Sequence, residues 1–90
     1  MGAAYLRVEP VDLLVRDDES IVVYESRFVR LGPLATFIVV NAETPQTADE
    51  LTARLTDAFG APAEGSASDA TRRMLVDLVA QGVLQEVHRH

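Results

Sequence analysis

Cysteine is absent from this chain of 90 residues, which excludes disulfide bonds, thiolate metal sites and cysteine nucleophiles. Lysine is absent as well, so that all eight basic residues are arginine, and fourteen acidic residues give a net charge of −6. An acidic chain disfavours unspecific binding to nucleic acid or to anionic membranes, because both depend on neutralising phosphate charge. We therefore expect neither nucleic acid nor a membrane among its partners.

Long apolar runs are also missing. The longest run, Phe37–Val40, is far shorter than the about 20 residues of a transmembrane helix, and residues 1–7 lack the apolar core of a signal peptide. With 48% hydrophobic and 24% charged residues, the composition is that of a folded globular protein. We expect one cytoplasmic domain over residues 1–90, with a core from about 11 to 87 and disorder confined to its two ends.

Strand patterns occupy the first third of the chain. The polar stretch 17–20 reads as a turn between two runs rich in β-branched and aliphatic residues. In a third run, Phe28 and Arg30 point to one face of a strand, while Val29 and Leu31 point to the other. Together the runs predict a three-stranded antiparallel meander over residues 11–16, 21–25 and 28–31.

Helix signals begin after the predicted sheet. Gly32-Pro33 ends the last strand and favours a first helix over residues 34–41, although its short apolar run would also suit a buried strand. Thr47 and Glu50 then form a capping-box pattern, and Gly60 stands where a helix commonly ends. These signals predict a second helix between them.

A third helix follows a loop of small residues. Ser68 is its predicted cap, and Gly82 ends it ahead of a short strand over residues 83–87. Leu55 and Leu78 are predicted core residues on the facing sides of the last two helices. The fold class expected is α+β and winged-helix-like, with a three-stranded antiparallel sheet followed by three helices and a short C-terminal strand.

Signatures of catalysis are lacking. The histidines, His88 and His90, lie in the last three residues, where a side chain lacks the fixed surroundings that a general base or a metal ligand needs. The acidic groups at 17–19 and 49–50 fall in a predicted turn and in the first turn of a helix, where acids are favoured structurally. Phosphate-binding loops, nucleophile elbows and zinc motifs are absent. We expect no enzyme activity, no cofactor and no bound metal.

A winged-helix arrangement also suggests a DNA-binding regulator. Its recognition helix would run over residues 68–81, with positive charge at Arg72 and Arg73. Asp69 lies three residues before Arg72 and four before Arg73, and Asp77 lies four beyond Arg73, which is close enough for pairing on the helix surface. With a net charge of −6, such pairing is favoured over contact with phosphate. DNA binding is therefore the less favoured interpretation, and it is kept as an alternative.

The strand over residues 27–31 offers the remaining binding feature. A small meander leaves strands at its edges with unpaired backbone donors and acceptors, and this strand carries Arg27 and Arg30 among apolar residues. An edge strand beside a helix can capture an extended peptide by adding it to the sheet. The same arginines would also suit a protected edge as solubilising residues, and the pattern alone leaves the two interpretations level.

A family pattern extends over nearly the whole chain, from about Val11 to Val87. It is carried by Ile21-Val22-Val23-Tyr24, Val29-Arg30-Leu31, Thr47-Ala48-Asp49-Glu50-Leu51 with Leu55 and Phe59, Met74-Leu75, Leu78-Val79 and Gly82-Val83-Leu84. In these segments the chain resembles the PqqD-like family of peptide chaperones, the RiPP recognition elements that act on ribosomally made, post-translationally modified peptides.

The resemblance implies a non-catalytic module that binds the leader segment of a precursor peptide and presents it to a peptide-modifying enzyme. The leader would add beside the third strand of the meander, in a groove against the third helix. The residues so implied are Arg27, Phe28, Val29, Arg30 and Leu31 on the strand, and Arg72, Leu75, Val76 and Val79 on the helix. Leader peptides are often acidic, which would complement these arginines. A homodimerising scaffold subunit of the same fold is a further alternative.

Overall fold

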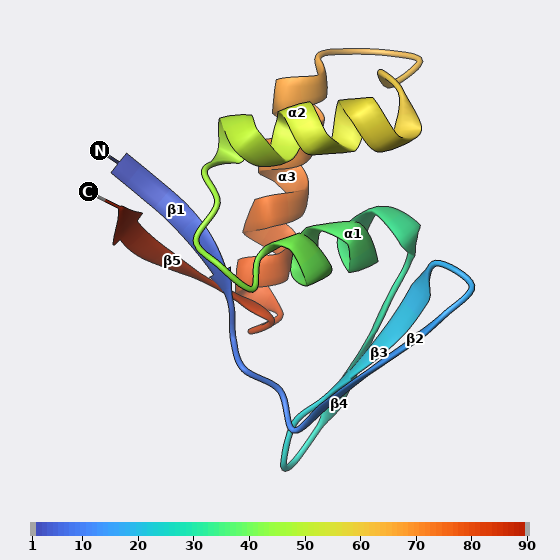
Figure 1. The fold of residues 1–90 in the computed structure, drawn as a ribbon, viewed down its shortest axis with the longest axis vertical. Helices are drawn as coiled ribbons and strands as arrows, with labels where there is room; N and C mark the ends of the chain where they lie inside the picture. Colours follow the sequence, from blue (N-terminus) through green and yellow to red (C-terminus); the bar gives the residue numbers. More distant parts are fainter. Residues whose placement is uncertain (1, 90) are drawn as a thin grey trace.

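The computed structural model describes residues 2–89, which form five strands and three helices (Figure 1). The strands are β1 (Gly2–Arg7), β2 (Asp12–Arg16), β3 (Glu19–Val23), β4 (Phe28–Leu31) and β5 (Leu84–Arg89). The helices are α1 (Pro33–Asn41), α2 (Ala48–Phe59) and α3 (Ala67–Ala80). The predicted α+β class, with a three-stranded antiparallel sheet and three helices, is confirmed.

The three-stranded sheet has the order β2-β3-β4 and is antiparallel throughout. The β2–β3 turn is shorter than predicted, because Glu19 and Ser20 belong to β3. Asp17 and Asp18 make the turn alone, with positive φ angles of 51° and 71°. Two central residues of this kind match the right-handed twist of the flanking strands, which is why two-residue hairpin turns favour them.

The two ends of the chain form a separate antiparallel ribbon, β1 with β5, whose strands lie side by side in Figure 1. Here the sequence-based expectation of disordered ends is wrong. Ala4 is fully buried, and Tyr5 also exchanges backbone hydrogen bonds of 2.7 and 3.0 Å with Gln46. His88 lies in β5 opposite Ala3 rather than in a free tail, while His90 falls outside the described residues.

Helix caps explain where α2 and α3 begin. The Thr47 hydroxyl accepts from the Glu50 amide at 3.1 Å, and the Glu50 carboxylate accepts from the Thr47 amide at 2.8 Å, so the predicted capping box is confirmed. The predicted cap Ser68 is wrong, because Ser66 caps α3 by accepting from the Asp69 amide at 3.1 Å. Ser66 keeps the extended backbone that a cap requires, whereas Ser68 already lies in the helix.

The core is built around α1, which is apolar on almost every side. A helix that is hydrophobic all round is stable only where neighbouring elements cover it, and α1 packs against α2 and against both sheets. The predicted core residues Leu55 and Leu78 are confirmed, at 6% and 2% exposure. Besides Ala4, the buried hydrophobic residues form one cluster: Val22, Leu31, Ile38, Val39, Ala42, Leu51, Leu55, Leu75, Leu78, Val83 and Leu84.

A buried pair of hydroxyl groups ties the three-stranded sheet to α1. The hydroxyl of Thr36 donates to the Leu31 carbonyl at 3.3 Å, and it lies 2.8 Å from the Ser20 hydroxyl. Because Thr36 has one proton to give, Ser20 must donate to Thr36. Both hydroxyl groups are thereby hydrogen-bonded, and they connect β3, α1 and the end of β4.

Candidate functional site

β4 is one edge of the three-stranded sheet, since within residues 2–89 it pairs with β3 alone. The predicted facing of its side chains is confirmed: Leu31 is buried and Val29 partly buried, while Phe28 and Arg30 are exposed. Val29 and Leu31 therefore anchor the strand to the core. Phe28, at 67% exposure, and Arg30 lie on the uncovered face of the sheet.

The free hydrogen-bonding groups of β4 belong to alternate residues. The Tyr24 amide donates to the Arg27 carbonyl at 2.8 Å across the β3–β4 turn, which marks these two as a hydrogen-bonded pair. Bonded and non-bonded pairs alternate along an antiparallel ladder. The amide and carbonyl of Val29 consequently face β3, whereas those of Phe28 and Arg30 face outward. Two residues of β4 thus present a backbone edge on which an extended peptide can form a ladder.

A groove runs along this edge, between β4 and α3. It has a volume of about 180 Å³, smaller than the roughly 300–1,000 Å³ of typical small-molecule sites. Its residues are Arg30, Leu31 and Gly32 at the end of β4, Ala35 of α1, and Met74, Asp77, Leu78 and Gln81 along α3. A hollow of this size, lined by both apolar and polar side chains, suits one side chain of a peptide lying on the edge.

Arg27 holds the two walls of the groove together. Its guanidinium donates to the carbonyls of Gln81 at 3.0 Å and Gly82 at 3.3 Å, where a positive charge is favoured by the exposed carbonyls of a helix end. The guanidinium also lies 4.4 Å from the centre of the Tyr24 ring. Burial raises the pKa of Tyr24 above its ordinary value of 10.0, although Arg27 opposes the rise, and the Tyr24 phenol donates to the Val8 carbonyl at 3.0 Å. Arg27 therefore has partners within the fold.

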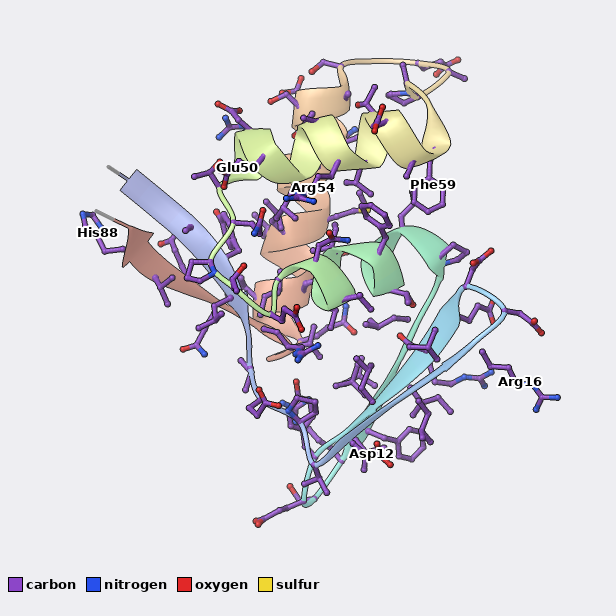
Figure 2. The ribbon with its side chains drawn as sticks, viewed as in Figure 1. Asp12, Arg16, Glu50, Arg54, Phe59 and His88 are labelled. Atoms are coloured by element: carbon purple, nitrogen blue, oxygen red, sulfur yellow. The ribbon has the colours of Figure 1, made fainter. Side chains whose placement is uncertain are left out.

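Replacing Arg27 by alanine is expected to lower the free energy of unfolding by about 1 kcal/mol, because two hydrogen bonds from an exposed cation to helix-end carbonyls are lost. Thermal and urea denaturation will measure the change. Arg54→Ala is the matched control: Arg54 is an exposed arginine on α2 (Figure 2), and we expect its loss to change stability by less than about 0.5 kcal/mol. Equal stability of the two variants would contradict a structural role for Arg27.

The helix residues implied by the family resemblance lie elsewhere on α3. At 100° per residue, Val76 is about 160° around the helix from Met74, which lines the groove. Arg72 and Val79 share the side of Val76, and Leu75 is in the core at 1% exposure. The groove face of α3 is instead Met74, Asp77, Leu78 and Gln81. Met74 and Leu78 stood out in the sequence as apolar positions, but the polar Asp77 and Gln81 gave no signal.

Arg72 finds its partner on a neighbouring helix. Its guanidinium lies 3.7 Å from the Asp49 carboxylate of α2 and 3.4 Å from the Ser68 hydroxyl. The predicted pairing with Asp69 of the same helix is therefore replaced by an ion pair between α3 and α2. Arg30 and Asp77 both line the groove, Arg30 from the end of β4 and Asp77 from α3.

Across residues 2–89, histidine, cysteine and acidic side chains nowhere gather in a group of three or more that could hold a metal ion. None of the three helices described there has the length and apolar character needed to cross a membrane.

Comparison with known proteins identifies no relative: family models, curated proteins and solved structures all gave no significant match.

Proposed function

We propose that the chain is a cytoplasmic, non-catalytic module of the PqqD-like type, which binds the leader segment of a precursor peptide by strand addition. The observation that carries this proposal is the open edge of β4, where the outward backbone groups of Phe28 and Arg30 run beside a groove lined by α3. Backbone bonds of this kind supply affinity to any extended peptide, and side-chain pockets supply specificity.

The groove suggests what the peptide should carry. A strand added to β4 would alternate its side chains between the two faces of the sheet. One set would point toward Ala35, Met74 and Leu78, which form the apolar part of the groove. The other would lie beside Phe28 and Arg30 on the uncovered face. We expect an apolar anchor residue in the first set and an acidic residue near Arg30 in the second.

Presentation to a modifying enzyme follows from this mode of binding. A peptide added to an edge strand has only a short segment ordered, since β4 offers outward groups at just two residues. The rest of the precursor remains free to enter the active site of a separate enzyme. The module would therefore raise the local concentration of substrate at that enzyme without contributing catalytic groups.

The test is a titration of ¹⁵N-labelled protein with synthetic leader segments from short reading frames encoded beside its gene. Backbone amide shifts are expected to cluster on Phe28–Leu31 and on the groove face of α3, from Met74 to Gln81. Shifts confined to α2, or to the side of α3 that carries Arg72 and Val76, would contradict the proposed site. Failure of every encoded leader segment to bind would contradict the function.

A further inference from the structure

β2 is the other edge of the three-stranded sheet, opposite to β4, since among residues 2–89 it pairs with β3 alone. Arg16 pairs with Glu19 across the two-residue turn, and the residues at the base of such a turn form a hydrogen-bonded pair. By alternation, Asp12 and Leu14 also bond to β3, so the backbone groups of Leu13 and Val15 face outward. The Leu13 amide accordingly donates to the Asp12 carboxylate at 2.9 Å and not to a carbonyl of β3.

The sequence of this edge, Asp12-Leu13-Leu14-Val15-Arg16, is self-complementary when read against itself in the antiparallel direction. With a two-fold axis at Leu14, Asp12 of one copy stands opposite Arg16 of the other, and Leu14 stands opposite itself. Leu13 of one copy stands opposite Val15 of the other. Every side chain thus meets one of opposite charge or one that is also apolar, and such cross-strand pairs stabilise a sheet.

The backbone independently favours the same register. In an antiparallel ladder, residues with outward groups must face each other as hydrogen-bonded pairs. A centre at Leu14 places the outward groups of Leu13 opposite those of Val15 in the second copy, which gives two such pairs. A shift by one residue would place outward groups opposite inward ones. A centre at Leu13 or at Val15 would also oppose outward groups, but it gives only one such pair within β2, so the register with more hydrogen bonds is also the one that pairs the charges.

We infer that β2 is a homodimerisation edge, on which a second copy of this chain adds to form a continuous six-stranded sheet. In this dimer the Leu13 amide donates to the Val15 carbonyl of the second copy instead of to the Asp12 carboxylate. The Asp12 carboxylate is then available to pair with Arg16 of that copy. Asp12 and Arg16 lie at the two ends of the strand, and Arg16 projects away from the rest of the chain (Figure 2). Leu14 and Val15, exposed by 52% and 54%, supply the apolar part of the contact.

The dimer does not depend on the proposed peptide binding, because the two edges of the sheet are separate. Both copies of β4 remain at the outer edges of the six-stranded sheet, and their grooves stay open. The contact is small, since paired strands of five residues cover less than a standard protein interface of about 1,600 Å². We therefore expect a reversible dimer whose population rises with protein concentration.

A cysteine crosslink tests the register directly, because the natural chain has no cysteine. In Leu14→Cys the two thiols would lie on the two-fold axis in a non-bonded pair, with α-carbons about 4.5 Å apart, within the range of a disulfide. Val11→Cys is the matched control: Val11 is even more exposed, at 68%, but its two copies would be separated by about 20 Å. Mild oxidation is expected to crosslink the first variant and to leave the second monomeric on a non-reducing gel. Equal crosslinking of both would overturn the inference.

Charge reversal tests the end pairs by analytical ultracentrifugation. Asp12→Arg alone, or Arg16→Asp alone, would place like charges opposite each other twice in the dimer, and each should weaken association about tenfold. The double variant D12R/R16D restores both opposite-charge pairs and should recover the dimer. Circular dichroism of the monomers will verify that each variant is folded. A wild-type chain that stays monomeric at every concentration, or a double variant no better than the singles, would overturn the inference.

Discussion

Replacing Leu78 by alanine is expected to lower the free energy of unfolding by about 2–5 kcal/mol. Leu78 is 2% exposed, and it lies where α3 meets both the core and the wall of the groove beside β4. The loss combines the transfer free energy of the removed methyl groups with the cavity they leave. For a domain whose total stability is about 5–15 kcal/mol, this single truncation would remove a large part of it.

Val76→Ala provides the control for Leu78→Ala on the same helix. Val76 is 70% exposed, so its truncation removes little buried surface and should change stability by less than about 0.5 kcal/mol. Urea denaturation of the two variants, followed by circular dichroism, will compare their midpoints. An unchanged midpoint for Leu78→Ala would show that α3 does not pack as described.

The second large effect is expected from Arg30→Pro, which should weaken binding of a leader peptide about tenfold or more. Proline has no amide hydrogen, and the Arg30 amide is one of the two outward donors of β4. A ladder that loses this donor leaves a peptide carbonyl without its partner, which costs more than the bond itself contributes. The fold should tolerate the change, because proline is accepted in edge strands where the amide faces solvent.

Two further variants separate the backbone from the side chain in this experiment. Arg30→Ala keeps the amide and should weaken binding less than Arg30→Pro does. Val29→Pro removes an amide that bonds to β3, so it should destabilise the three-stranded sheet instead of acting on peptide binding alone. Isothermal titration calorimetry with a binding leader segment, together with thermal denaturation, will distinguish the three. Wild-type affinity in Arg30→Pro would show that the peptide does not use this edge.

Much of the fold could be predicted because local signals agreed with the tertiary structure. The capping box at Thr47 and Glu50 has a fixed spacing and a single physical meaning, and α2 begins there. The cap of α3 was misplaced since Ser66 and Ser68 are equally good candidates by type. Residues 2–7 gave no strand pattern, because Gly2, Ala3 and Ala4 have low strand propensity. Only pairing with β5, at the far end of the chain, makes them a strand.

One wall of the candidate site, the β4 strand, could be predicted from the sequence. Alternation along Phe28–Leu31 correctly separated the buried from the exposed side chains of β4. The facing side of α3 was not predictable in the same way, because apolar residues occur on several sides of this helix: Leu75 enters the core, Met74 lines the groove, and Val76 is exposed. Which of these sides faces β4 depends on the orientation of α3 about its own axis in the packed core. The periodic pattern of apolar residues does not determine that orientation. Arg27 illustrates the same limit, since its partners at Gln81 and Gly82 are distant in the sequence.

The pairing of β1 with β5 has a consequence for the order of folding. Even the closest paired residues of this ribbon, Arg7 and Leu84, enclose almost the entire chain between them, so the ribbon must close a very long loop. The entropy lost in closing a loop grows with its length, and contacts between distant residues slow folding. The β2-β3-β4 meander, by contrast, joins neighbouring segments through short turns. The meander should therefore form early and the ribbon late, so that both edges of the sheet are exposed to other chains before Ala4 is buried.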